Sequence, residues 1–274
     1  MRGPAILDVA QDHALQILHN AGLFHEGLVF KGGTALRKFR AGNAGRFSTD
    51  LDFAVSEPGL AELVLETLDG SRLDDFEFSV EVTVEGRRAN LGVTSPFGEL
   101  GIGAGIDISP TLPWLQAELR SAILMPIHAR YSFTLPPTPI IQVEELIAEK
   151  LARYRRDSLA RDVYDLAWFH GSVFDERLVR RLTAMKVWWD VLRDGLGSRP
   201  FDPRAILGPR RPTDFRAEAI GQLTDPVDLQ RWSDQVRRRF VFLNDLDADE
   251  VLLAQCTLRE ESLFRRKLAA LPGF

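Results

Sequence analysis

The apolar positions in the first half of the chain change their period several times, as they do where helices and strands alternate. Residues 5–21 repeat apolar side chains at helical spacing. Residues 76–85 instead alternate between apolar and polar side chains, which is typical of a half-buried strand. Shorter patterns predict strands over residues 28–30, 51–55, 91–94 and 102–108, and helices over residues 34–39 and 57–70.

A proline-rich segment, residues 136–139, separates this half from one with a purely helical pattern. The helices predicted there span residues 142–156, 161–170, 176–193, 214–222, 226–243 and 248–270, with a Pro/Gly-rich stretch over 195–212. We therefore predict an α+β chain with two domains. An α/β domain with a sheet covers residues 1–138, and an all-helical domain covers residues 139–274.

The composition is that of a globular protein, with 45% hydrophobic and 27% charged residues. No run of 18 apolar residues predicts a membrane span. Asp8 and Asp12 interrupt the apolar positions near the start, so we expect no secretory signal. The single cysteine, Cys256, permits no internal disulfide. These features favour a cytoplasmic protein.

The net charge of −5 argues against a general nucleic-acid coat. The charge is unevenly distributed, because residues 1–140 hold 11 Lys/Arg and 17 Asp/Glu, whereas residues 141–274 hold 23 and 22. The basic residues of the second half form clusters: Arg153, Arg155 and Arg156; Arg210 and Arg211; Arg237, Arg238 and Arg239; and Arg265, Arg266 and Lys267. Such clusters either follow a phosphate backbone or are solvated helix faces balanced by nearby acids.

A double glycine between a predicted strand and a predicted helix is the first candidate for chemistry. Gly32 and Gly33 follow Lys31, and Thr34 and Arg37 lie on the helix after them. Glycines allow backbone N–H groups to approach a ligand, and a helix start favours negative charge. We predict that this segment binds nucleotide phosphates, although the same pattern also occurs in an ordinary strand-to-helix turn.

Asp50 and Asp52 alternate along the next predicted strand, so both carboxylates leave the same face. Two adjacent like charges are unfavourable unless a cation lies between them, and oxygen ligands suit Mg²⁺. Asp107, isolated between two isoleucines on a later strand, is the predicted third carboxylate, as a metal ligand or as the acceptor of a hydroxyl proton. Glu81 and Asp74 are weaker substitutes for it.

The second half contributes a lysine at an unexpected position. In the predicted helix 142–156, Lys150 occupies the inward-facing stripe formed by Val143, Leu146, Ile147, Leu151 and Tyr154. A buried ammonium needs an anionic partner, so Lys150 either reaches nucleotide phosphates or extends to the edge of the stripe. Asp162 and Asp165 share one face of the following helix and can pair with Lys150 or an arginine, although Asp162 can equally be a helix cap.

Four segments together resemble the AbiEii-type, MenT-like nucleotidyltransferase toxins. They are KGGTALRK at 31–38, RFSTDLDF at 46–53, EELIAEKLARY at 144–154 and RDVYDL at 161–166. The resemblance covers roughly residues 25–170. It implies a polymerase-β-like nucleotidyltransferase core, a mixed sheet with helices, followed by an all-helical C-terminal domain. It also implies Mg²⁺ (or Mn²⁺), a nucleoside triphosphate substrate, and an antitoxin encoded beside the gene.

The resemblance also assigns roles to individual residues. Asp50 and Asp52 match the metal-binding pair, and Lys150 matches the family lysine. Asp165 matches the family's late acidic residue. Asp162 is the alternative for that match, and we predict that Asp162 binds the nucleotide. Ser48 matches a hydroxyl at the nucleotide that is phosphorylated in some members, and a phosphate there would repel the metal carboxylates and the triphosphate. Asp107 matches only through its strand.

The function that we predict is transfer of NMP from an NTP to the 3′ end of an RNA, with the tRNA acceptor stem as the expected target and a block of translation as the result. Two alternatives stay open. The first is transfer to a protein or small molecule, for which the negative net charge is the main support. The second is a non-catalytic nucleotide-binding module.

Overall fold

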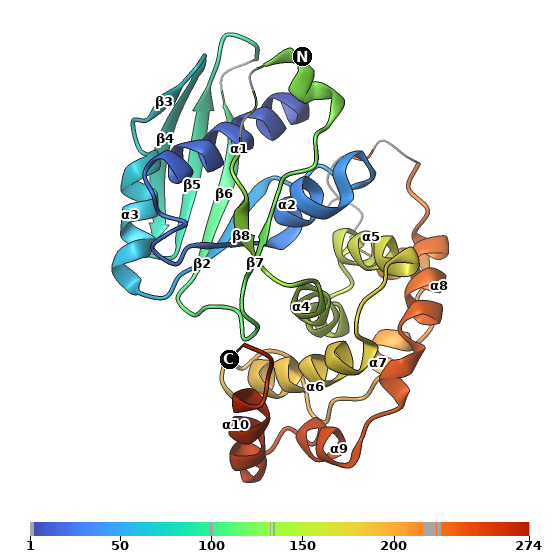
Figure 1. Ribbon diagram of the computed structural model, residues 1–274. Helices are drawn as coiled ribbons and strands as arrows, with labels where there is room; N and C mark the ends of the chain where they lie inside the picture. Colours follow the sequence, from blue (N-terminus) through green and yellow to red (C-terminus); the bar gives the residue numbers. More distant parts are fainter. Residues whose placement is uncertain are drawn as a thin grey trace. The chain divides into compact units, whose positions relative to one another are not determined.

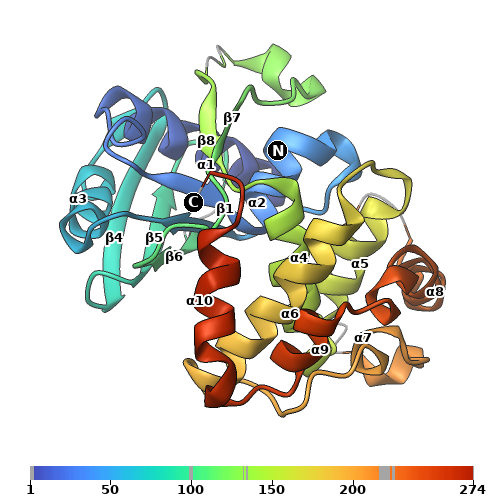
Figure 2. The same cartoon turned by 60° about the horizontal axis from the view of Figure 1, so that its bottom comes forward.

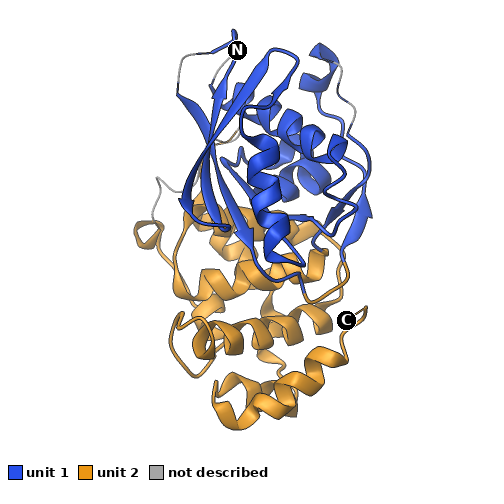
Figure 3. Ribbon diagram, turned by 90° about the vertical axis from the view of Figure 1, so that its left-hand side faces the viewer, with its two compact units in different colours: residues 1–113, 117–141 blue, residues 114–116, 142–274 orange. Residues whose placement is uncertain are grey.

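The structure of the protein is a computed structural model that describes residues 3–98, 101–131, 133, 135–215, 223 and 226–273. The chain divides into two compact units, shown in different colours in Figure 3. The sheet unit comprises residues 1–113 and 117–141. The helical unit comprises residues 114–116 and 142–274.

Among the described residues, the sheet unit contains an eight-stranded mixed sheet with the order β3-β4-β5-β6-β2-β1-β8-β7 (Figure 1). Its strands are β1 (Val29–Lys31), β2 (Asp50–Ala54), β3 (Arg72–Leu73), β4 (Phe76–Val84), β5 (Arg88–Thr94), β6 (Ile102–Ser109), β7 (Glu118–Arg120) and β8 (Thr138–Ile140). β2 is parallel to β6 and β1 is parallel to β8, whereas the other neighbours are antiparallel. The sheet is therefore mixed, as the sequence predicted.

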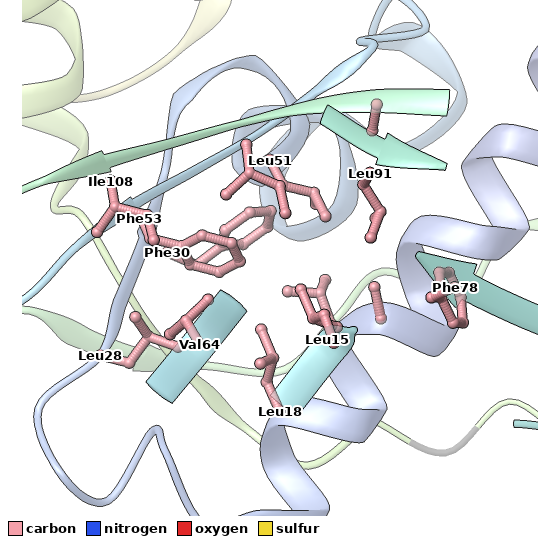
Figure 4. Packing of buried hydrophobic residues seen from close by; sticks show 14 of the residues in the cluster. Leu15, Leu18, Leu28, Phe30, Leu51, Phe53, Val64, Phe78, Leu91 and Ile108 are labelled. Carbon is pink, nitrogen blue, oxygen red and sulfur yellow. The ribbon is translucent and has the colours of Figure 1, made fainter. Parts of the chain in front are cut away.

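One face of this sheet forms the hydrophobic core with α1 (Gly3–Asn20) and α3 (Pro58–Leu68). Leu51 and Phe53 of β2 and Leu91 of β5 point into this core, where they meet Leu15 and Leu18 of α1 (Figure 4). Because side chains alternate along a strand, Asp50 and Asp52 leave the opposite face. The apolar partners of β2 thus fix the side on which its carboxylates lie.

The acidic residues that interrupt the apolar pattern of α1 are buried, and both form ion pairs. Asp8 lies 3.0 Å from Arg37 and 3.1 Å from Lys38, and Asp12 lies 2.7 Å from Lys38. Arg37 and Lys38 belong to η1 (Arg37–Ala41), a wide helical turn that continues the short helix α2 (Gly32–Leu36). The network therefore anchors the segment after the glycine turn to α1.

The helical unit contains α4 (Val143–Arg156), α5 (Ala160–Trp168), α6 (Glu176–Leu192), α7 (Arg204–Leu207), α8 (Leu229–Arg239), α9 (Ala248–Ala254) and α10 (Glu261–Ala269). α4 packs against both α5 and α6, and Figure 2 shows the three helices beside one another. Trp188 of α6 stacks on Phe264 of α10, with ring centroids 4.4 Å apart. Their rings belong to a second, separate hydrophobic cluster.

The structure corrects several predicted elements. The helix predicted over residues 248–270 is two helices, because Cys256 adopts a φ of +49°, which a continuing helix does not allow. β5 begins at Arg88 rather than at Leu91, because the polar residues at its start face outward and interrupt the apolar pattern. The short strands β3, β7 and β8 were not predicted. Of the helix predicted over 214–222, residues 216–222 lie outside the described residues.

Candidate active site

The glycine turn between β1 and α2 brings the backbone against a carboxylate of β2. Gly32 has a φ of +79°, which favours glycine. A Cβ at this position would lie 1.8 Å from Oδ2 of Asp52, so the Asp52 carboxylate rests directly on the Gly32 backbone. Gly32 is therefore required both for its conformation and for the space that Asp52 occupies.

The second glycine makes room for two further polar side chains. A Cβ at Gly33 would collide with the Arg46 guanidinium and lie 2.9 Å from Oγ of Ser48. Arg46 is only 7% exposed. Arg46 was not among the site residues predicted from the sequence, although it opens the segment RFSTDLDF that carries the resemblance. A cation and a hydroxyl thus meet at the turn where phosphates were predicted.

Thr34 and Arg37 have contacts that hold the turn in place. Oγ1 of Thr34 donates a hydrogen bond to the carbonyl oxygen of Asp50, joining α2 to β2. The Arg37 guanidinium donates two hydrogen bonds to Asp8 and one to the carbonyl oxygen of Gly45. Burial raises the pKa of Asp8, but the Lys38 charge and the Arg37 hydrogen bonds outweigh burial and leave it below its ordinary value. The Asp8 carboxylate therefore stays ionised between these two cations.

Strand register places four charged residues in one row across the outward face of the sheet. Lys31 of β1 pairs with Asp52 of β2, Asp52 pairs with Asp107 of β6, and Asp107 pairs with Arg88 of β5. Paired residues on neighbouring strands share a face. The structure thus brings Asp107 to the strand beside Asp52, as the sequence predicted.

The row next to this one contains Asp50 and a glycine. Asp50 pairs with Gly105 of β6, and a Cβ at Gly105 would lie 2.9 Å from Oδ1 of Asp50. Gly105 therefore leaves room for the Asp50 carboxylate, as Gly32 does for Asp52. Each carboxylate of the pair thus lies against a glycine backbone, and Oδ1 of Asp50 also accepts a hydrogen bond from Oγ1 of Thr49 at 3.3 Å.

The donor set suits a hard divalent cation bound by two carboxylates and completed by substrate oxygens. Within the described ranges, no group of three or more His, Cys, Asp or Glu side chains is arranged to hold a metal ion. The Asp107 carboxylate accepts a hydrogen bond from Nε of Arg88 at 2.9 Å. Of the predicted substitutes, Glu81 lies within hydrogen-bonding distance of Asn90, and Asp74 binds His13. Asp50 and Asp52 are the two carboxylates that β2 places on one face beside the glycine turn.

In the helical unit, Lys150 is 3% exposed and pairs with Asp165, with 2.7 Å between Nζ and Oδ2. Asp162 is also buried and accepts a hydrogen bond from Nε of Arg153 at 2.8 Å. The inward position of Lys150 and its need for an anionic partner were predicted from the helical stripe, and the structure confirms both. Asp165 is that partner.

The arginine clusters of the helical unit are largely occupied by contacts within the unit. Carboxylates or backbone carbonyl oxygens bind most of their side chains: Arg153 (Asp162), Arg155 (Ser198), Arg156 (Asp190), Arg210 (Tyr154), Arg211 (Asp214), Arg237 (Leu207), Arg239 (Glu176), Arg265 (Glu261) and Lys267 (Asp249). Their density in the sequence therefore overstates the positive charge available to a phosphate backbone.

Comparison with known proteins now places these features in a family. The model of the family described as "Nucleotidyl transferase AbiEii toxin, Type IV TA system" matches residues 15–260. The chain belongs to the AbiEii nucleotidyltransferase toxin family. This result confirms the resemblance that the four sequence segments indicated, and it places the chain among the toxins of toxin–antitoxin systems.

Two solved structures are similar to this chain to different degrees. MenT4, a nucleotidyltransferase toxin from Mycobacterium tuberculosis H37Rv, is 46% identical over 98% of this chain and 94% of its own, with a TM-score of 0.94. A putative nucleotidyltransferase from H. pylori shares the fold, with 16% identity over 90% of this chain and 99% of its own and a TM-score of 0.51. The comparison with curated proteins gives no match.

The predicted fold class is therefore confirmed. Members of such a family use a nucleoside triphosphate and generally a divalent metal, and a type IV system includes an antitoxin. None of the helices in the described part of the chain is long and apolar enough to cross a membrane.

Proposed function

We propose that this AbiEii-family protein transfers NMP from an NTP to the 3′-hydroxyl of an RNA, with the tRNA acceptor end as the target and a block of translation as the consequence. The observation that carries the proposal is the outward face of β2 and β6, where Asp50, Asp52 and Asp107 lie beside the glycine turn. This arrangement combines a metal-binding pair, a phosphate-binding turn and a third carboxylate. A metal-assisted NMP transfer can use each of these parts.

The glycine turn binds the triphosphate in this proposal. The phosphate oxygens accept hydrogen bonds from the backbone N–H groups that follow Gly32 and Gly33 and from the Ser48 hydroxyl. The Arg46 guanidinium offsets the negative charge of the phosphates. A Mg²⁺ ion (or Mn²⁺) held by Asp50 and Asp52 supplies charge stabilisation to the phosphates when bound. We place no phosphate on the side chains of Thr34 and Arg37, since both are held by other contacts.

The chemical step joins the acceptor oxygen to the α-phosphorus. The bond between that phosphorus and the bridging oxygen to the β-phosphate breaks, and pyrophosphate leaves with the electron pair. In this proposal Asp107 accepts the hydroxyl proton, and its register beside Asp52, on the strand next to the proposed metal-binding pair, supports this role. The products are an RNA longer by one nucleotide and pyrophosphate.

Lys150, Asp162 and Asp165 belong to the helical unit, and we propose that they act in the same reaction, as the family resemblance implies. Lys150 supplies a positive charge whose orientation Asp165 fixes through their 2.7 Å contact. Asp162 holds Arg153 in the same way. The two carboxylates thus set the positions of two cations.

Ser48 is the proposed site of control by a cognate antitoxin. Its hydroxyl lies at Gly33, beside the position that we assign to the triphosphate. A phosphate on Ser48 would occupy that space and bring negative charge to Asp50 and Asp52, so the modified protein would bind NTP weakly. In this proposal the system works in the cytoplasm, where its RNA acceptor is found.

The direct test incubates the protein with total tRNA, Mg²⁺ and each labelled NTP in turn, and then sequences the labelled RNA ends. We expect label on RNA with at least one NTP and none with Asp50→Asn, whose fold is checked by circular dichroism. Absence of label on RNA with every NTP would refute the RNA proposal.

A second candidate, transfer to a protein or small-molecule acceptor, is favoured by one observation. The basic clusters of the helical unit are mostly bound to carboxylates and carbonyl oxygens of the same unit. Adding a cell extract to the labelling reaction distinguishes the two candidates. Label that survives ribonuclease and disappears with protease would favour the protein acceptor.

A further inference from the structure

The outer end of the charged row is formed by an arginine with no role in the nucleotide site described above. Arg88 of β5 is 65% exposed and donates to Asp107, which is 49% exposed, at 2.9 Å. Exposed ion pairs contribute little net stability, because both groups are nearly as well solvated apart. Arg88 can therefore exchange Asp107 for another anion at small cost.

The two ends of the row face different neighbours. Lys31 precedes the glycine turn, which is the proposed triphosphate site. At the other end, β5 and β6 carry glycines where longer side chains would otherwise cover the outward face: Gly105 lies between Asp50 and Asn90, and Gly103 pairs with Gly92. A Cβ at Gly92 would lie 2.5 Å from Oγ of Ser79, so a side chain there would have to displace the Ser79 hydroxyl. The outward face of the sheet near Arg88 is thus made mainly of backbone and carries few long side chains.

The charged side chains on this outward face restrict which acceptors can bind there. Among the described residues of β2, β4, β5 and β6, Arg88 is the one cation on the outward face, whereas Asp50, Asp52, Asp107 and Glu81 are carboxylates there; Glu77 of β4 is paired with Arg72 of β3. An acceptor with a phosphate close to its hydroxyl would be repelled by these carboxylates unless Arg88 bound that phosphate. A neutral acceptor would have no use for Arg88.

We infer that Arg88 binds the last phosphodiester of the acceptor strand and thereby selects a nucleic-acid 3′ end. This inference rests on the proposed function and identifies the residue that recognises the acceptor. When the phosphate binds, Arg88 releases the Asp107 carboxylate, which then accepts the proton of the 3′-hydroxyl of the same terminal nucleotide. Recognition of the acceptor and release of the base are thus one event.

The experiment compares Arg88→Ala, Arg88→Lys and Arg72→Ala with the wild type. Arg72 is a matched control, because it is an arginine of the same sheet that is 71% exposed and forms a 2.7 Å pair with Glu77, on the edge strand β3. The KM for total tRNA and the KM for the NTP are measured separately, each with the other substrate saturating. Salt dependence is measured on kcat/KM for the RNA, and melting temperatures check the fold.

We expect Arg88→Ala to raise the KM for RNA about tenfold, as loss of one charge-assisted contact would, and to change the KM for NTP less than twofold. The slope of log kcat/KM against log salt should become shallower by about 0.7, the value for one lost contact to a single-strand phosphate. Arg88→Lys should keep part of the affinity and of the slope, because it keeps the charge. Arg72→Ala should match the wild type.

Two outcomes would overturn the inference while the proposed function stands. In the first, Arg88→Ala labels RNA with unchanged KM and salt slope. In the second, only kcat and its pH profile change, which would make Arg88 a positioning residue for Asp107. If the wild type labels no RNA, the proposed function itself fails, and the inference about Arg88 fails with it.

Discussion

Replacing Gly32 by alanine should strongly reduce activity through a clash with the side chain of Asp52. The new Cβ would lie 1.8 Å from Oδ2 of Asp52, far inside van der Waals contact, and the backbone would keep a φ of +79°. The positive φ costs roughly 1–2 kcal/mol for alanine, and overpacking adds typically 1–3 kcal/mol. Displacing the Asp52 carboxylate by about 1 Å should reduce the rate of NMP transfer roughly a hundredfold.

Gly22 is the matched control for this prediction. It has the same φ of +79°, but a Cβ there would meet no atom within 4 Å. Gly22→Ala should therefore lose only the backbone contribution to the free energy of unfolding and retain full activity. Both variants are compared by thermal unfolding and by the labelled-NTP assay.

A double mutant separates the clash from the conformation. In an Asp52→Gly background, Gly32→Ala should destabilise the protein no more than Gly22→Ala does, because the whole Asp52 side chain, including the Cβ that would lie 2.8 Å from the new Cβ, is gone. The reasoning would be refuted if Gly32→Ala were as active as Gly22→Ala, or if its loss of stability were the same with and without Asp52.

Three further predictions concern the charged groups. Arg46→Gln should weaken NTP binding, measured by equilibrium titration in the absence of acceptor, by about tenfold or more, and Arg46→Lys by less; equal affinity in all three proteins would remove Arg46 from the phosphate site. The folded-state pKa of Asp8 is lowered, so Asp8 contributes to stability above its unfolded pKa of about 3.9, and this contribution is lost as pH falls through the folded pKa. Asp8→Asn should therefore flatten the acid limb of the curve of unfolding free energy against pH. An unchanged acid limb would contradict this prediction. Lys150→Met should lower the free energy of unfolding by about 3–5 kcal/mol, because it removes the Lys150 ammonium from the buried Asp165 carboxylate. The double mutant Lys150→Met/Asp165→Leu should recover stability but not activity. An active double mutant would refute the proposed role of Lys150.

Much of the site could be predicted from the sequence because its signals are local. Asp50 and Asp52 alternate with Leu51 and Phe53, so a period of two is enough to put both carboxylates on the face away from the core. Lys150 was conspicuous for the same reason, since a period of 3.6 puts it inside an apolar stripe. A residue that breaks the pattern of its own element can be found without knowing the fold.

Other features depend on contacts between residues far apart in the chain, which no local period reports. Asp8 and Asp12 interrupt the apolar positions of the first helix, and both are buried in ion pairs with Arg37 and Lys38, about 30 residues later in the chain. The row formed by Asp52, Asp107 and Arg88 depends on strand register, which follows from the whole sheet. Arg46 was missed because its role depends on the glycine turn that it approaches.

The arginine clusters show why composition is a poor guide to the acceptor. A guanidinium that already binds a buried or half-buried carboxylate, as Arg156 binds Asp190, must give up that contact before it can bind a phosphate. Exposed Arg88 gives up only a weak pair, and it does so next to the carboxylate that needs to be freed. The position of a cation relative to the reacting atoms therefore counts for more than the local density of cations in the sequence. On this argument, we expect Arg88 to contribute more to selection of the acceptor than an arginine such as Arg156, whose carboxylate partner is largely buried.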